Sequence, residues 1–466
     1  MKINDPKLSP ANYLPQFVIV TLMFFIFGFL TTMNGVLVPK FKENFSLDYF
    51  QATLVQFAFF TAYLVVSLIY FLVSFYFRKA TRSFHYKGAM VYGLFVTALG
   101  AFGFYPSTQL ESYPLFLFSL FVMASGITLI QTGVNPYVAL LGKPRTASGR
   151  LNLTQAFNSL GTTLAPLIGS LWLAADSGSK ETFVLLDHVY LLMAVIVVLV
   201  AVSTWRMRFP DVARSKGYEE VDVSRPVFKT PHLMWGALAI FFYVGAEVSV
   251  GSLLISLIEL KAVAGFSAKK GAQFLSLYWA GLMVGRFFAA IYLSKVSRKK
   301  RPIFVFLVLM LAFGVALGVS DFGWLNAVIY LVLVLFCYTA FLFNNQKPRR
   351  LLVQLAVYAV VCIFAVVFLR GTISMWLAIA LGLCHSVMFP TIFTLAIREL
   401  GENTPQGTSI LMMAIVGGAI LPVVQGHLSD IVGVKSSFLM LLVSYAYILF
   451  YALKGADTPA DTFGKE

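Results

Sequence analysis

Long apolar segments, repeated along almost the whole chain, constrain its fold more than any other feature of the sequence. Fourteen such runs, each near the length of about 17–25 residues that crosses a bilayer as a helix, cover residues 17–38, 52–77, 88–105, 114–141, 153–175, 189–205, 233–258, 271–293, 303–319, 324–343, 351–369, 373–397, 409–424 and 438–453. Charged residues make up only 12% of the chain, too little for the surface of a soluble domain. The chain is therefore predicted to be an all-α polytopic membrane protein.

Positive charge, a net +15, is distributed over alternate short loops between the apolar runs. The bases of these loops are Arg78, Lys79, Arg82, Lys87, Lys143, Arg145, Arg150, Arg206, Arg208, Arg214, Lys216, Lys295, Arg298, Lys299, Lys300, Arg301, Lys347, Arg349 and Arg350. The positive-inside rule assigns these loops and both termini to the cytoplasm, although Lys261, Lys269 and Lys270 lie on the opposite side. Bases confined to loops, without interleaved aromatic residues, exclude nucleic acid as a partner and indicate a lipid bilayer instead.

The longest polar connection follows the sixth apolar run and suggests the domain organisation. Residues 1–205 are predicted to form a six-helix bundle, residues 206–232 a cytoplasmic linker, and residues 233–466 a second bundle of eight helices. The two halves of the sequence are weakly similar to each other. Short basic loops, "RKATRSFHYKG" and "SKVSRKKRP", follow the second and eighth helices. Two pseudo-symmetric bundles around a central path are therefore expected.

Amide side chains recur at helical spacing inside the first five apolar runs. Gln131 and Asn135 share one face of the fourth helix with Thr128, and Gln155 and Asn158 share one face of the fifth with Thr162. Asn34 lies in the first helix, and Gln56 in the second together with Tyr63. Amides both donate and accept hydrogen bonds, which suits a neutral polyol such as a sugar, and Phe393 is one of several aromatic rings that could pack on it. Packing between helices is the alternative use of any single amide.

Charged or titratable side chains are rarer within the apolar runs. Glu247 lies near the middle of the seventh helix, where it could carry a proton, bind a cation or a sugar, or pair with a distant cation. Arg286, in the cytoplasmic part of the eighth helix, is a candidate for gating contacts. His385 and the three cysteines, Cys337, Cys362 and Cys384, are interpreted as core residues, because they show neither metal-ligand nor disulfide spacing.

Six ordered motifs resemble one known family, the fucose–galactose–glucose:proton symporters of the major facilitator superfamily. They are "FFIFGFLTTMNGVLVPKF", "HYKGAMVYGLFVTALGAFGFYPS", "ASGITLIQTGVNPYVALLG", "RLNLTQAFNSLGTTLAPLIGS", "YVGAEVSVGSLL" and "MFPTIFTLAIRELG…GGAILPVVQGHLSD". The resemblance implies a bacterial inner-membrane importer of monosaccharides that works by alternating access. It also implies that Asn34, Gln56, Gln131, Asn135, Gln155 and Asn158 line the sugar pathway.

The chain departs from this family at three places. Gly35 and Gln131 stand where the fucose permease has membrane carboxylates, although glutamine there resembles the glucose/galactose branch. Proton coupling could then pass to Glu247, sodium could replace the proton, or transport could be uncoupled. The family has twelve helices, and the additional pair within residues 303–369 is either 303–343 or 324–369. The loop at residues 74–88 lacks the acid usual in major facilitator proteins.

Other classes of protein fit the sequence less well. In fourteen-helix drug:proton antiporters the additional pair typically lies between the two six-helix halves, whereas here it interrupts the second half. A membrane enzyme would need a titratable pair or a metal cluster near an interface. No enzyme activity, metal or cofactor is expected beyond a co-transported proton or sodium ion. The sequence thus predicts a secondary importer of glucose-, galactose- or fucose-like hexoses, with cation-coupled symport expected, and a uniporter or a transporter of another small polar solute or drug as the alternative.

Overall fold

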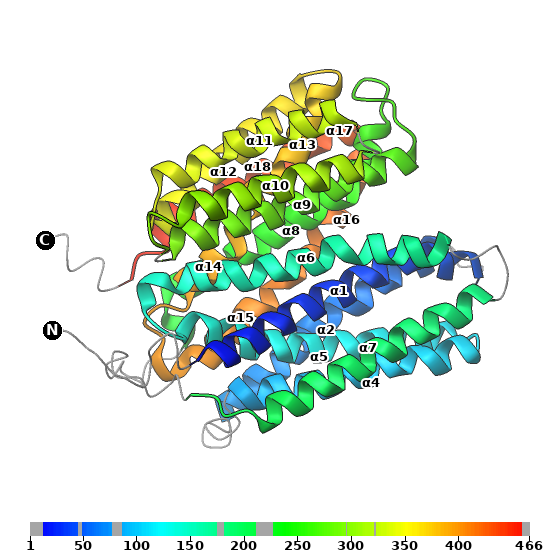
Figure 1. The fold of residues 1–466 in the computed structure, drawn as a ribbon, viewed down its shortest axis with the longest axis vertical. Helices are drawn as coiled ribbons and strands as arrows, with labels where there is room; N and C mark the ends of the chain where they lie inside the picture. Colours follow the sequence, from blue (N-terminus) through cyan, green and yellow to red (C-terminus); the bar gives the residue numbers. More distant parts are fainter. Residues whose placement is uncertain are drawn as a thin grey trace, which may run out of the picture. The chain divides into compact units, whose positions relative to one another are not determined.

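The fold is that of a computed structural model that describes residues 13–44, 49–76, 86–174, 181–210, 227–294, 296–320 and 323–458. Within these ranges the secondary structure is helical and contains no strand (Figure 1). Thirteen helices of the described ranges are long and apolar enough to cross a membrane. The chain is therefore an all-α polytopic membrane protein, as predicted. The loop bases Arg78, Lys79, Arg82, Arg214, Lys216 and Lys295 lie outside the described residues.

The first half of the sequence supplies six long helices. They are α1 (Leu14–Asn44), α2 (Tyr49–Tyr76), α4 (Tyr86–Gln109), α5 (Tyr113–Leu140), α6 (Ala147–Ala174) and α7 (Glu181–Arg206), with a 3-10 turn η3 (Pro144–Thr146) before α6. Helix α6 has 28 residues but is not among the thirteen apolar helices. Its polar residues, those of the "LNLTQAFNSLGTT" stretch, lower its hydropathy, and the same residues made it a candidate for substrate binding.

The second half supplies eight spans, several of them interrupted. The elements are η5 (Val227–Lys229), α8 (Pro231–Glu259), α9 (Ala268–Leu293), α10 (Arg301–Val319), α11 (Trp324–Phe343), α12 (Pro348–Phe368), α13 (Thr372–His385), α14 (Met388–Ala396), η6 (Gly401–Asn403), α15 (Thr404–Met413), η7 (Ala414–Val416), α16 (Gly417–Val432), α17 (Val434–Ser437), η8 (Phe438–Met440), α18 (Leu441–Phe450) and the π-helical turn η9 (Tyr451–Gly455).

Two of the predicted helices are broken in the structure. The run at residues 373–397 becomes α13 and α14, with Ser386 and Val387 between them, because Pro390 lacks the N–H that would bond to the Ser386 carbonyl. The run at residues 409–424 becomes α15, η7 and α16. The first break leaves the Ser386 carbonyl without its helical donor, so this carbonyl is available to a side chain.

Contacts divide the chain into two compact units that do not simply follow the order of the sequence. One unit holds Met1–Gly142, Leu160–Val223 and Leu400–Met413, and the other holds Lys143–Ser159, Ser224–Glu399 and Ala414–Glu466. Each unit therefore includes a short segment from the opposite half of the sequence, namely the first part of α6 or the whole of α15. The predicted bundle boundaries at residues 205 and 233 stay a prediction.

Glycine allows a close contact between two helices of the first unit, α4 and α5. A Cβ on Gly126 of α5 would lie 2.3 Å from the Thr97 backbone nitrogen of α4, and one on Gly100 of α4 would lie 2.3 Å from the Met123 nitrogen of α5. Such distances exclude any larger residue unless the backbones separate. Close packing of this kind through small residues is typical of helices in membranes, and it sets the position of α5 and its amides.

Packing in the second unit favours one of the two predicted insertions. In the first unit α4 packs against α5 and α7, which are the next helix and the last helix of the six. In the second unit α12 packs against α13 and α18, which are likewise the next helix and the last α-helix of the bundle. Helices α10 and α11 pack against each other and against α9. Helix α11 also packs against α12 and α13. This pattern matches an insertion at residues 303–343 with α12 as the counterpart of α4, and the location of the additional pair stays a prediction.

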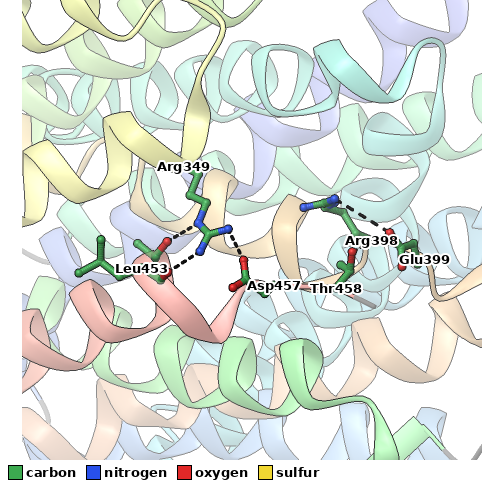
Figure 2. A network of polar contacts seen from close by, with 7 residues as sticks. Arg349, Arg398, Glu399, Leu453, Asp457 and Thr458 are labelled. Atoms are coloured by element: carbon green, nitrogen blue, oxygen red, sulfur yellow. Dashed lines mark hydrogen bonds and ion pairs between the residues drawn. The ribbon is translucent and has the colours of Figure 1, made fainter. Parts of the chain in front are cut away.

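Arg349, at the start of α12, caps the C-terminal end of the last helix (Figure 2). The Arg349 guanidinium donates to the backbone carbonyl of Ala452, to that of Leu453 at 2.6 Å and to a carboxylate oxygen of Asp457 at 2.5 Å. The last carbonyls of a helix lack intrahelical donors and carry partial negative charge, so a cation there stabilises the helix end. Nearby, the Thr458 hydroxyl donates to Glu399 at 2.8 Å.

Replacement of Arg349 tests this contact. We expect Arg349→Ala to lower the free energy of unfolding by about 2 kcal/mol, since partly exposed hydrogen bonds to a charged group contribute about 1.5–3 kcal/mol when well formed. Arg349→Lys should recover only part of the loss, because an ammonium cannot reproduce the fork of the guanidinium. The measurement is thermal unfolding of the purified protein in detergent. Arg350→Ala, which removes an exposed neighbouring charge, is the matched control, and equal melting temperatures for both variants would contradict the contact.

Candidate functional site

Two of the predicted pathway residues meet in the first unit. The Gln131 side chain of α5 donates from Nε2 to the Tyr63 hydroxyl of α2 at 2.5 Å, and both side chains are buried. This bond joins two helices in the way that interhelical amides commonly do. It occupies one donor of the amide and leaves its other groups for further bonds.

Asn135 lies one turn further along α5 and is completely buried. Its Nδ2 contacts the Met412 sulfur of α15 at 3.9 Å, which is a weak interaction, and its Oδ1 has no hydrogen-bond partner in the described structure. The Thr408 hydroxyl, one turn from Met412 on α15, is likewise buried without a partner among the described residues. Buried polar atoms are nearly always hydrogen-bonded in proteins, and an unpaired one costs about 1–3 kcal/mol. An acceptor left free at this place is suited to a hydroxyl of a bound solute.

The remaining predicted pathway residues lie elsewhere or outside the described part. Asn34 and Gln56 belong to α1 and α2, but their side chains are outside the described residues. Gln155 is buried and Asn158 is half-buried, and both lie on the part of α6 that belongs to the second unit. Phe393 of α14, in the same unit, is completely buried and its ring stacks on Phe389 with centroids 5.9 Å apart.

Arg286 is the centre of a buried polar cluster in the second unit. Its Nε donates to the Ser386 carbonyl at 3.1 Å, and its Nη1 donates to the Ser159 hydroxyl at 2.5 Å and to the Gln155 carbonyl at 3.3 Å. The side chain is only 5% exposed. The Ser386 carbonyl can accept this bond because Pro390 leaves it without a helical donor. Arg286 therefore ties α9 to the break between α13 and α14 and to the first part of α6.

Close backbone contacts support this cluster from two sides. A Cβ on Gly285 would lie 2.1 Å from the Ser386 hydroxyl oxygen, and one on Gly149 at the start of α6 would lie 2.7 Å from the Leu293 carbonyl carbon at the end of α9. Glycine is therefore needed at both places for α9 to approach its neighbours. The sequence indicated Arg286 but not its partners Ser159 and Ser386. Pro390 could have indicated in the sequence that the Ser386 carbonyl has no helical donor.

Glu247 is half-buried on α8 within electrostatic range of Arg286 and of Tyr243, one helical turn before it. The backbone carbonyl of Glu247 also accepts a hydrogen bond from the Tyr278 hydroxyl at 2.9 Å. A carboxylate within the electrostatic influence of an arginine and a phenol can hold or release a proton as its surroundings change. Among the described residues no group of histidine, cysteine, aspartate and glutamate is arranged to hold a metal ion.

His385 is a satisfied core residue, as predicted from the sequence. Its Nδ1 lies 2.8 Å from the Tyr278 hydroxyl and its Nε2 lies 2.7 Å from the Tyr445 hydroxyl, and the ring is completely buried. Since Tyr278 gives its single proton to the Glu247 carbonyl, Nδ1–H of His385 donates to Tyr278, and in the neutral ring Nε2 accepts from Tyr445. The ring thus holds the end of α13, next to Ser386, against α9 and α18.

Comparison with known proteins agrees with this architecture. The sequence profile of the Major Facilitator Superfamily matches residues 20–346. The chain is 38% identical over 459 residues to a glucose/galactose transporter of Brucella abortus, covering 98% of each chain. It is 27% identical over 469 residues to the L-fucose-proton symporter of Escherichia coli, covering 95% of this chain and 93% of the relative. A crystal structure of the E. coli fucose:proton symporter matches with a TM-score of 0.71 and 26% identity, covering 96% of this chain and 100% of that one.

The chain therefore belongs to the Major Facilitator Superfamily, which confirms the predicted fold class and the family resemblance. Its full-length relatives are transporters and not enzymes, as expected.

Proposed function

We propose that this protein is a secondary active importer of monosaccharides that works by alternating access, with glucose or galactose as the first substrates to test. The relatives of the same length are named for glucose, galactose and fucose transport. The observation that carries the proposal is the Oδ1 of Asn135, a buried acceptor without a partner among the described residues, one turn along α5 from Gln131. A sugar hydroxyl would supply the missing donor, and the amides of Gln131 and Asn135 would discriminate its orientation. Asn34, Gln56, Gln155, Asn158 and Phe393 are proposed as further contacts.

Arg286 is proposed to gate the pathway on the cytoplasmic side. Its bonds to Ser159, the Gln155 carbonyl and the Ser386 carbonyl can exist only while α6, α9 and the α13–α14 break lie together. Separation of these elements would break all three bonds at once, which gives the two-state behaviour that alternating access requires. We also propose that the protein lies in the bacterial inner membrane with both termini in the cytoplasm. The orientation is based on the basic residues of the loops.

Glu247 is proposed as the coupling residue, because it offers a carboxylate within the membrane near the gating arginine. The experiment measures the internal pH of proteoliposomes while glucose, galactose or fucose is added outside, with and without sodium. We expect a sugar-dependent fall of internal pH that does not need sodium. In Glu247→Gln, sugar exchange should persist while the proton movement is lost. Sugar flux that leaves the pH unchanged would overturn proton coupling, and the sodium-free arm then separates sodium symport from uniport.

A further inference from the structure

The loops at one end of the α10–α11 hairpin lie side by side. The backbone N–H of Gln346, in the loop from α11 to α12, donates to the carbonyl of Tyr292 near the end of α9, with 3.2 Å between the atoms. The loop from α9 to α10 starts two residues after Tyr292. The described bases of these two loops and of the first turns of α10 and α12 are termed here the hairpin basic cluster, which comprises Arg298, Lys299, Lys300, Arg301, Lys347 and Arg350.

The bases of this cluster have no acidic partner within the part of the chain that the structure describes. Among the described residues no carboxylate forms an ion pair with any of its members, whereas the adjacent Arg349 is paired with Asp457. Helices α10 and α12 both begin at the cluster, and neither has an acidic residue in its first turn. The N-terminus of a helix carries partial positive charge and free N–H groups, which adds to the charge of the side chains. This end of the hairpin is thus suited to an anion.

Arg301 provides the most specific feature of the cluster. Its guanidinium lies over the Tyr292 ring, with 4.9 Å from the Cζ atom to the ring centroid. The Tyr292 hydroxyl is bonded to that of Tyr338, so the ring on which Arg301 rests is held in place. The Nε of Arg301 is buried and has no hydrogen-bond partner in the described structure. A guanidinium held in a fixed orientation can offer its terminal N–H groups to phosphate oxygens, which it binds with strong charge-assisted bonds.

The surface next to the cations is apolar and exposed. Ile303 and Phe304 in the first turn of α10 are 61% and 44% exposed, and Phe306 and Leu307 follow in the next turn with 58% and 55%. Phe343, at the end of α11, is 77% exposed. A free phosphate could use the cations but not this apolar flank. A phospholipid with an anionic headgroup could use both, because its phosphate and its acyl chains are joined in the same order.

We propose that the hairpin basic cluster is a binding site for the headgroup of an anionic phospholipid, with Arg301 and Lys347 contacting the phosphate and the α10 flank contacting the acyl chains. Clusters of bases directly outside a membrane helix attract anionic lipids with about 1 kcal/mol per base. The site includes none of the proposed sugar-contacting residues and does not depend on the proposed transport function. It would anchor the additional helix pair at the membrane surface.

The test compares lipids by thermal unfolding of the full-length protein in detergent. Phosphatidylglycerol, phosphatidylcholine with the same acyl chains, and inorganic phosphate are each titrated against wild type and against Arg301→Gln/Lys347→Gln. We expect stabilisation by phosphatidylglycerol alone, with the half-maximal concentration raised about 25-fold in the double variant, since each lost base should weaken binding about fivefold. High salt should weaken the effect because it screens exposed charges.

Two further variants control for indirect effects of the substitutions on stability. Arg206→Gln/Arg208→Gln removes the same charge from exposed bases of another loop and should respond to phosphatidylglycerol like wild type. Lys347→Gln alone changes an exposed side chain, so the fold should persist, and should weaken the lipid response about fivefold. Equal stabilisation by phosphatidylcholine, an equal loss in the Arg206/Arg208 control, or full replacement of the lipid by inorganic phosphate would each overturn the proposal.

Discussion

Replacement of Arg286 by alanine should lower the rate of sugar uptake by about 100-fold. The side chain makes three hydrogen bonds, to Ser159, to the Gln155 carbonyl and to the Ser386 carbonyl. Hydrogen bonds of a charged group contribute about 1.5–3 kcal/mol, and a loss of about 3 kcal/mol changes the population of the closed arrangement by about 100-fold. Ser159, the Gln155 carbonyl and the Ser386 carbonyl would each lose the bond from the guanidinium. The measurement is the initial rate of uptake into proteoliposomes, normalised to the amount of inserted protein.

Partner replacement separates gating from simple loss of structure. Arg286→Lys keeps the charge but not the planar fork, so we expect an intermediate rate. Ser159→Ala removes one of the three contacts and should slow uptake alone, yet it should add almost nothing in the Arg286→Ala background, because the two residues act through one bond. Uptake at the wild-type rate in correctly inserted Arg286→Ala would remove Arg286 from the transport cycle.

Replacement of Asn135 by alanine should weaken sugar binding by about 10- to 100-fold, since loss of a bond from a buried amide costs about 1–3 kcal/mol. The same change should leave the melting temperature of the sugar-free protein unchanged or higher. The reason is that Asn135 makes only the weak Met412 contact, and its Oδ1 is an unpaired acceptor in the described structure. Binding is measured from the concentration dependence of uptake, and stability from thermal unfolding in detergent without sugar.

Gln131 and Tyr63 supply the matched comparison. Gln131→Ala breaks the bond to Tyr63 and should lower both sugar affinity and stability. Tyr63→Phe removes the same bond from the other side, so it reports the structural share of the effect alone. If Gln131 contacts sugar, its replacement lowers affinity further than Tyr63→Phe does. An Asn135→Ala variant that is destabilised but binds sugar normally would show that these amides only hold helices together.

His385 stabilises the part of the backbone that Arg286 contacts. Its two ring bonds, to Tyr278 and Tyr445, fix the end of α13 next to the Ser386 carbonyl that Arg286 uses. A histidine so completely bonded and buried has a packing role, which agrees with its interpretation from the sequence. Variants at His385 would therefore disturb the Arg286 site indirectly, and direct tests of gating belong at Arg286 and Ser159.

Hydropathy alone determined that this chain is an all-α membrane protein, because hydrocarbon leaves a backbone no alternative to helices at that length. The amides of α5 and α6, together with Glu247 and Arg286, could be found in the sequence because polar side chains are costly in such surroundings. Their partners could not be found in this way. The bond between Gln131 and Tyr63 joins residues 68 positions apart, and that between Arg286 and Ser159 joins residues 127 apart.

Tertiary structure decided what each polar residue does, since the partner of a side chain depends on which helices pack together and at which depth. It divided the predicted site residues between two compact units and packed α12 against α13 and α18, much as α4 packs against α5 and α7. It also left Oδ1 of Asn135 free among the described residues while Gln131 was paired. A sequence shows the cost of burying an amide in a membrane, but only the packing of the helices shows whether the protein itself supplies the compensating bond or leaves it to a ligand.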